Sequence, residues 1–405
     1  MEPSISRRAR LTPSSPIRKL QGLANAAEKR GVSVYHLNIG QPDFPTPQRF
    51  FDEMKKYDHG TLSYAPSKGY HHVIRAWQSY YRSLGIRLKE EDLMLTTGGS
   101  EAILFALLSV TDPGDKVVVF EPLYTNYLAF GRIAGVSFTP VTLHASNGFH
   151  LPPTRDIEKA ISGRTKAIIL CNPSNPTGTV FTRRELQVIA ALALRHKLFI
   201  ITDETYREIV FQKQKAASFM SFPALHDRVV LVDSVSKRFN LCGARIGCLA
   251  SRNKRVMESA EKFAQSRLSS PSLGQLAVIP LLKNASRFIK PIVREYRKRR
   301  DTIVKELQEI PGTGLYSPEG AFYIITALPV RDAEHFCRWM LTSFQVSGRT
   351  VMLAPAAGFY ATKNKGKNEV RIAYVLSVKR IKRAMEILRA GIEAYQKKYG
   401  QAKKR

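Results

Sequence analysis

The chain has 405 residues, of which 44% are hydrophobic and 24% charged, a composition typical of a well-packed soluble protein with two or three domains. Lysines and arginines number 63 against 33 aspartates and glutamates, which gives a formal net charge of +30. No apolar run is long enough to cross a membrane, and the basic N-terminal stretch lacks the apolar core of a secretory signal. We therefore expect a cytoplasmic protein without a membrane partner.

The positive charge raises nucleic acids as possible partners. The charge is spread along the chain, with denser runs at 294–300 and at the C-terminal end. No aromatic-interleaved RNA motif and no helix-turn-helix pattern accompanies it, so a charged, solvated surface is the favoured interpretation and nucleic-acid binding the disfavoured one. The four cysteines form no CxxC pair and the nine histidines show no ligand spacing, so we predict neither a metal site nor a disulfide framework.

The stretch from residue 92 to 250 alternates predicted strands with predicted helices. Helices are expected at 100–110 and 182–197. Continuous β-branched runs suit a sheet that is buried on both faces and covered by helices. This pattern predicts an α/β domain. The predicted strands are 92–97, 115–122, 165–173, 198–204, 228–234 and 244–251.

After about residue 290 the pattern changes. A long basic helix is expected at 285–310, a hairpin at 311–328, a strand at 370–375 and an amphipathic helix at 378–400. Such a mixture predicts a smaller α+β domain. We expect a large domain over 46–290 and a small domain that joins residues 1–45 to residues 291–405.

Polar residues follow the predicted strands at the points where those strands end. Ligands of an open parallel sheet bind beyond the carboxyl ends of its strands. Gly98 and Gly99 stand between a strand and a helix, where backbone N–H groups can cradle a phosphate. Each such residue alone has an ordinary structural explanation, as a cap, a turn or a packing residue. Together they predict one binding site, formed by Gly99, Ser100, Tyr124, Asn175, Asp203, Tyr206, Ser234 and Lys237.

The stretch SVSKRFNLCGARIG (234–247) places Lys237 after two small residues and before a spaced glycine, arginine and glycine. It resembles the lysine signature of the fold-type I pyridoxal-phosphate enzymes, in the class I/II aminotransferase family. The resemblance covers nearly the whole chain, and it implies a large domain with a mostly parallel mixed sheet plus a smaller α+β domain. The other matching blocks are LNIGQPDFPTP (37–47), YAPSKGYHHVIRAW (64–77), TTGGSEA (96–102), DPGDKVVVFEPLY (112–124), NPSNPTG (172–178), DETY (203–206), GAFY (320–323) and VRIAYV (370–375).

The resemblance implies pyridoxal 5'-phosphate as the cofactor and gives the lysine its role. A lysine ε-amino group can bond covalently to the cofactor's aldehyde, and the freed Lys237 can then act as a general base. By the same resemblance Asp203 pairs with the protonated ring nitrogen. Tyr206 and Asn175 hydrogen-bond the phenolic oxygen, and Tyr124 stacks on the ring.

The cofactor phosphate is expected to lie among Ser234, Arg245, Gly99 and Ser100, because a guanidinium grips oxyanions with its planar fork. Tyr64 matches a family tyrosine that reaches the phosphate of the neighbouring subunit. The resemblance therefore implies a homodimer with shared active sites.

The substrate's α-carboxylate is expected to bind Arg371, assisted by Gly40 and Asn175. The side chain of the substrate is less defined, because Ser100 stands where some aspartate-preferring relatives have a lysine. Arg267 and Lys68 are loose candidates for reading an acidic side chain, and an ordinary surface charge is the better explanation of each.

The predicted reaction moves an amino group between an L-amino acid and a 2-oxo acid. Glutamate and 2-oxoglutarate form one expected pair, and aspartate or an aromatic or neutral amino acid belongs to the other. Two alternatives remain: a β-eliminating lyase on the same scaffold, and a non-catalytic basic binding protein.

Overall fold

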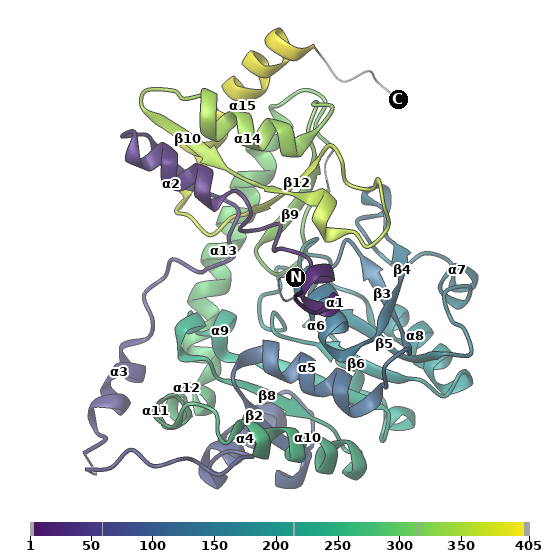
Figure 1. Cartoon of the computed structure of the whole chain (residues 1–405). Coiled ribbons are helices and arrows are strands. Elements are labelled where there is room, and N and C mark those ends of the chain that lie inside the picture. The colour runs from purple at the N-terminus through teal and green to yellow at the C-terminus, as the bar shows by residue number, and fades with distance from the viewer. Residues whose placement is uncertain (1–3, 59, 214, 315, 401–405) are drawn as a thin grey trace.

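The computed structural model describes residues 4–58, 60–213, 215–314 and 316–400 (Figure 1). Seven strands form one sheet in the order β2-β8-β7-β6-β5-β3-β4. β8 runs antiparallel to both of its neighbours, and every other neighbouring pair is parallel. The expected mostly parallel mixed sheet is therefore confirmed. Its strands are β2 (Leu93–Thr96), β3 (Lys116–Glu121), β4 (Ser137–Thr142), β5 (Thr165–Cys171), β6 (Phe199–Asp203), β7 (Val229–Ser234) and β8 (Gly247–Ala250).

Helices cover both faces of this sheet, and β5 illustrates the consequence. Ile168 and Leu170 belong to the hydrophobic cluster that includes α4 and α8, whereas Ala167 and Ile169 belong to the cluster that includes α5, α6 and α10. Side chains alternate between the faces of a strand, so a strand covered on both sides must be apolar throughout. The covering helices are α4 (His71–Ser83), α5 (Gly98–Val110), α6 (Asn126–Ala134), α8 (Arg183–Arg195) and α10 (Lys254–Arg267).

Two smaller sheets lie beside one another in the upper part of Figure 1. One pairs β1 (Ser33–His36) with β10 (Arg349–Met352) in parallel, so the N-terminal segment lies with the C-terminal third of the chain. The other is antiparallel, with β12 between β11 and β9. The predicted domain boundaries remain a prediction. Further elements of this region are β9 (Tyr323–Ala327), β11 (Ala354–Pro355), β12 (Glu369–Ala373), α2 (Gln21–Lys29), α14 (Ala333–Ser343) and α15 (Val378–Tyr399).

The long helix α13 (Ala285–Gln308) connects the two regions (Figure 1). Its Ile289 packs in the core of the large sheet, and its Tyr296 packs in the core of the smaller sheets. None of the helices in the described part of the chain is both long and apolar enough to span a bilayer. The remaining α-helices are α1 (Arg7–Leu11), α3 (Gln48–Lys55), α7 (Thr154–Glu158), α9 (Val235–Arg238), α11 (Ser272–Ala277) and α12 (Ile279–Lys283). The 3₁₀ helices are Glu90–Asp92, Ala145–Asn147, Phe219–Ser221, Pro223–Leu225, Cys242–Ala244 and Ala356–Phe359.

The hairpin predicted at 311–328 is wrong. Among its described residues, which leave out position 315, only the second half contains a strand, β9, which pairs with β12, and a single backbone bond, from Gly314 N to Ala327 O, joins the two halves. The backbone just before β9 bonds elsewhere: Glu319 N and Gly320 N donate to Gly178 O, and Ala321 N donates to Ile209 O. The sequence contains a suitable turn but cannot indicate that distant loops compete for this backbone.

Candidate active site

The carboxyl ends of β5, β6 and β7 open onto one cavity of about 120 Å³. Nine predicted site residues line it together, although they come from five separate stretches of the chain. The residues that line the cavity are Gly99, Ser100, Ile103, Tyr124, Asn175, Asp203, Thr205, Tyr206, Ser234, Ser236, Lys237, Cys242 and Arg245. The predicted meeting of these strand ends at one rim is therefore confirmed, as far as the positions of the residues are concerned.

Lys237 lies on the short helix α9, which begins directly where β7 ends. The hydroxyl oxygen of Ser234 accepts a hydrogen bond from Ser236 N at 3.1 Å and so caps this helix. The Lys237 ammonium donates to Gly40 O at 2.9 Å and lies 3.5 Å from the sulfur of Cys242. An ammonium has three donors, so this side chain retains capacity for another partner inside the cavity.

Gly98 and Arg245 together form an anion cradle at the start of α5. No side chain caps the first turn of α5, whose N-terminal N–H groups carry partial positive charge. Arg245 Nη2 donates to Thr97 O at 3.2 Å, and a Cβ on Gly98 would lie only 2.4 Å from this nitrogen. Gly98 also has a φ of +74°, which favours glycine. Backbone donors, a guanidinium and the Ser234 hydroxyl thus surround a site suited to a phosphate.

Asp203 is the buried acid of the cavity. Burial raises its pKa, and hydrogen bonds from Thr205 and Tyr127 oppose that shift. Tyr127 Oη donates to Asp203 Oδ2 at 2.7 Å, and Thr205 N donates to Oδ1 at 3.1 Å. A buried carboxylate of this kind is best stabilised by an adjacent cation, such as a protonated ring nitrogen.

Arg371 reaches the cavity through Asn175. Its Nη1 donates to Asn175 Oδ1 at 3.2 Å and its Nη2 donates to Asn38 O, while its buried Nε has no partner among the described residues. Burial lowers the pKa of Arg371. On the other side of Asn175, its amide nitrogen lies 3.5 Å from Tyr206 Oη, which lies 2.8 Å from Tyr323 Oη. The guanidinium therefore has unused donor capacity next to the cavity, as a carboxylate-binding arginine requires.

Gly40 lies between Lys237 and Tyr323. A Cβ at Gly40 would come within 1.8 Å of the Tyr323 hydroxyl, so only glycine fits there. On the opposite side, Tyr124 Oη accepts a hydrogen bond from Asn126 Nδ2 at 2.9 Å. These contacts place two of the predicted residues, Gly40 and Tyr124, around Lys237 and its cavity.

Tyr64 is the one predicted site residue that does not approach the cavity, and it is 77% exposed. Both loose candidates for reading an acidic substrate have acidic neighbours within the chain. Arg267 Nε lies 3.1 Å from Glu101 Oε1, and Lys68 Nζ lies 3.9 Å from Glu261 Oε2.

Sequence reasoning missed Tyr127, Thr205, Cys242 and Tyr323. Tyr127 stands three residues after Tyr124, one helical turn on, which is a signal that could have linked it to the site. Tyr323 ends the quoted GAFY block but had no assigned role. Its contact with Tyr206 depends on the crossing of two distant segments, which no local pattern predicts.

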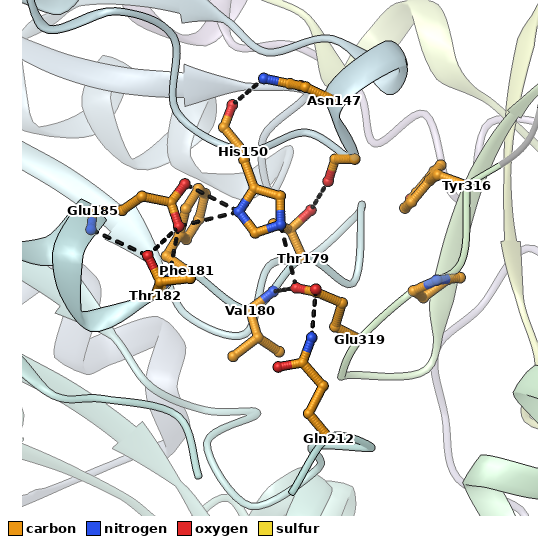
Figure 2. Close-up of polar contacts among 12 residues, drawn as sticks. Asn147, His150, Thr179, Val180, Phe181, Thr182, Glu185, Gln212, Tyr316 and Glu319 are labelled. Carbon is orange, nitrogen blue, oxygen red and sulfur yellow. Dashed lines mark hydrogen bonds and ion pairs between the residues drawn. The ribbon is translucent and has the colours of Figure 1, made fainter. Parts of the chain in front are cut away.

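A second cluster of ionisable groups, the His150 junction, consists of His150, Glu185 and Glu319 (Figure 2). The His150 ring nitrogens lie 3.0 Å from Glu185 and 3.5 Å from Glu319. Hydrogen bonds that the His150 ring donates to Glu185 and then to Glu319 raise the pKa of His150 to about 10. Burial alone would raise the pKa of Glu185, but hydrogen bonds from His150, Leu151 and Thr182 lower it to about 2. The junction thus ties the loop before α7 to α8 and to the segment before β9.

The cavity fits pyridoxal phosphate by the chemistry of its donors. An amine with spare donors at Lys237 and an uncapped helix start at Gly98 both lack partners that such a ligand provides. Asp203 provides the matching acid for a ring nitrogen. The donor set therefore accommodates a phosphate, an aldehyde and a pyridinium in one place.

Residues 32–389 match the family model described as aminotransferase class I and II. An aspartate aminotransferase of Thermotoga maritima is 28% identical over 94% of this chain and 97% of its own length. An aspartate/prephenate aminotransferase of Thermus thermophilus is 28% identical over 94% of this chain and 97% of its own. The solved alanine aminotransferase of Pyrococcus furiosus has a TM-score of 0.88 and 26% identity, and the match covers 96% of this chain and all of that one.

Proposed function

Because the chain belongs to the class I and II aminotransferase family, whose members depend on pyridoxal phosphate, we propose that Lys237 attaches the cofactor and moves the substrate proton. The enzyme transfers an amino group between an amino acid and a 2-oxo acid. Bound pyridoxal phosphate supplies an aldehyde that receives the amino group and a ring that withdraws electrons. The observation that carries the proposal is the convergence of Lys237, Asp203 and Arg245 on one cavity.

Lys237 and Asp203 take the two proton-handling roles. Lys237 Nζ contacts the Gly40 carbonyl and the Cys242 thiol, and its flexible stem would let it reach the substrate α-carbon and remove its proton. The Asp203 carboxylate, oriented by Tyr127 and Thr205, keeps the ring nitrogen protonated. By holding that nitrogen protonated, Asp203 would help to stabilise negative charge that develops at the α-carbon.

The other residues bind and orient. Arg371 is assigned to the substrate α-carboxylate together with Gly40 and Asn175, since it has a buried nitrogen to spare. The remaining assignments follow positions around the cavity: Ser234, Arg245, Gly99 and Ser100 for the phosphate, Tyr124 for the ring face, and Tyr206 with Asn175 for the phenolic oxygen.

Glutamate and 2-oxoglutarate are proposed as one substrate pair. For the other pair two observations point in different directions. Relatives named aspartate aminotransferases support aspartate, whereas within the chain Arg267 is already paired with Glu101 and Lys68 lies near Glu261, so the charge of each is balanced. An aromatic or neutral amino acid is therefore the second member that the chain's own charges favour.

A panel of amino donors tests this function directly. Purified holoenzyme is incubated with each L-amino acid and 2-oxoglutarate, and the glutamate that forms is measured. We expect glutamate from at least one donor and none without 2-oxoglutarate. Pyruvate and ammonia released from a cysteine derivative without any 2-oxo acid would instead establish the lyase reaction and contradict the proposal.

We also propose a homodimer in which Tyr64 reaches the partner's cofactor phosphate. The support is an exposed apolar patch on neighbouring segments: Leu62 is 55% exposed, Tyr64 77% and Leu268 51%. Ser272 Oγ donates to Ser63 O at 3.2 Å and holds these segments together. Contiguous exposed apolar surface of this kind marks protein–protein contacts.

Mixed dimers test whether Tyr64 acts across subunits. Lys237→Ala and Tyr64→Asp subunits, each weakly active alone, are unfolded together, refolded and assayed. If Tyr64 is donated by the partner, one hybrid site carries both defects and the other carries none, so activity returns. If mass spectrometry shows that hybrids have formed but their activity stays as low as that of the parent proteins, Tyr64 is not donated by the partner. It then either acts within its own subunit or has no role in the active site.

A further inference from the structure

The exposed face of α13 carries a row of cations, here called the basic stripe. Six exposed lysines and arginines form it, and at 3.6 residues per turn they lie within an arc of about 100°. The first and last of them are 18 positions apart, or roughly 27 Å along the helix. The stripe consists of Arg287, Lys290, Arg294, Arg297, Lys298 and Lys305.

The opposite face of α13 explains why the stripe is exposed. Ile292, Tyr296 and Ile303 are buried in the core that α13 shares with the smaller sheets. Alternation between apolar and basic positions in the sequence thus becomes two separate faces on the helix. A charge that is distributed along the chain in the sequence is therefore concentrated along one line on the surface.

No acidic group of the described residues neutralises the stripe. None of its six members forms an ion pair within 4–58, 60–213, 215–314 and 316–400, whereas cations elsewhere, such as Arg75 with Glu90, do. Asp301 lies within the same arc, but it pairs with Arg300 at 2.6 Å. Like charges three and four residues apart destabilise a helix, as do Lys290 with Arg294 and Arg294 with Lys298. The stripe thus presents positive charge that only an external anion can offset.

The residues of α13 indicate which kind of anionic surface could bind the stripe. A helix that lies on a membrane inserts an exposed apolar face, and no large exposed hydrophobic residue lies on α13 between Ala285 and Gln308. Single-stranded nucleic acids are held by exposed aromatic platforms, which α13 lacks for the same reason. A double-stranded nucleic acid needs only cations along its phosphates.

We propose that the basic stripe of α13 binds the phosphate backbone of a double-stranded nucleic acid without reading its sequence. The cations contribute charge alone, and the duplex displaces its counterions when it binds. The stripe is separate from the cavity that holds Lys237, so this interaction is additional to amino-group transfer.

Fluorescence anisotropy with the holoenzyme and a labelled 24-base-pair DNA duplex of arbitrary sequence tests the proposal. If all six cations meet phosphates, the logarithm of the binding constant should fall with the logarithm of salt at a slope of about −5. Affinity should drop about 10³-fold between 50 and 200 mM KCl. Absence of binding by the unaltered protein at 50 mM KCl would overturn the proposal.

Two variants of equal net charge separate the stripe from general positive charge. One carries Arg294→Glu, Arg297→Glu and Lys298→Glu, and the control carries Arg164→Glu, Lys166→Glu and Arg184→Glu. The control residues are exposed and unpaired among the described residues, and α8 lies on the right of Figure 1 whereas α13 lies on the left. We expect the stripe variant to bind at least tenfold more weakly, with a slope shallower by about three.

The duplex affinity of the control variant should fall less than threefold, and both variants should keep aminotransferase turnover. An equal loss of duplex affinity in both variants would mean that binding depends only on the total positive charge of the protein, and it would overturn the proposal. Tighter binding to vesicles containing phosphatidylserine than to the duplex would also overturn the proposal, because it would identify a membrane surface as the partner. If the glutamate variant fails to fold, Arg294→Gln, Arg297→Gln and Lys298→Gln replace it, with an expected slope change of the same sign.

Discussion

The His150 junction and the Lys237 cavity both bury ionisable groups, but they differ in how completely those groups are paired. At the junction both carboxylates accept bonds from within the chain: Leu151 N donates to Glu185, and Val180 N donates to Glu319 (Figure 2). Beside the cavity, Arg371 hydrogen-bonds Asn175 of the lining and has a buried Nε without a partner among the described residues, and within the cavity Lys237 has donors to spare.

The difference teaches how a shifted pKa should be interpreted. The pKa of His150 is raised to about 10, yet every strong partner is already in place, which is typical of a structural ion cluster. The pKa of Asp203 is also raised, but there the neighbouring space is a cavity. The shift therefore accompanies complete pairing at the junction and open space beside the carboxylate at the cavity, so the shift alone does not identify a binding site.

The largest effect is expected from Lys237→Ala. Without the amine the cofactor cannot attach covalently and the substrate proton has no base, so turnover should fall by at least about 10³-fold. Cofactor should still bind weakly through Arg245, Ser234 and Asp203, as a fluorescence titration would show. Near-normal turnover would mean that another lysine carries the chemistry.

Asp203→Asn should have the next largest effect. The amide keeps the shape but loses the charge that holds the ring nitrogen protonated, so the half-reaction with an amino acid should slow by about 100-fold or more. Stopped-flow absorbance of the bound cofactor measures this rate. Unchanged rates would show that a different group contacts the ring nitrogen.

Arg371→Lys should lower catalytic efficiency by a similar factor for every amino donor. Lysine keeps the charge but loses the planar fork, and loss of one charge-assisted hydrogen bond costs about 10- to 100-fold. The panel of donors provides the measurement. A loss confined to acidic donors would reassign Arg371 to the substrate side chain.

His150→Gln is the matched change at the junction, and it should leave kcat/KM within about twofold. It should instead cost about 1 kcal/mol of stability, and only over part of the pH range. Because folding raises the pKa of His150 from 6.5 to about 10, the stabilisation is complete below pH 6.5 and disappears as pH rises through 10.

Thermal unfolding of the unaltered protein and of His150→Gln between pH 6 and pH 10.5 checks the direction of this pH dependence. The difference in Tm should be largest at pH 6 and close to zero above pH 10. A difference that grows with pH, or a large fall in kcat/KM, would remove the contrast between the junction and the cavity.

The sequence predicted six of the seven strands of the large sheet, all except β4, and the rim of the cavity, because these depend on local patterns. Asp203 and Ser234 each end a buried strand, and parallel strands bring their ends to one edge. The contacts that hold these residues could not be predicted in the same way. Tyr323 meets Tyr206 across 117 positions, and the segment before it bonds to Gly178 in place of a hairpin partner.

The charge pattern was likewise only partly predictable from the sequence. The sequence contains the run at 294–300, but only the helical geometry of α13 separates it into an exposed basic face and a buried apolar one. The predicted role of Tyr64 depends on a second subunit, so it stays a prediction, as do the domain boundaries and the cytoplasmic location.

The central claim is that Lys237 bears the cofactor, and one measurement tests it most directly. The holoenzyme is reduced with borohydride, digested and mapped by mass spectrometry for the peptide that carries the cofactor. We predict the label on Lys237, in the peptide that follows β7, and none after Lys237→Ala. A label on any other lysine of the unaltered protein would contradict the assignment of this cavity as the active site.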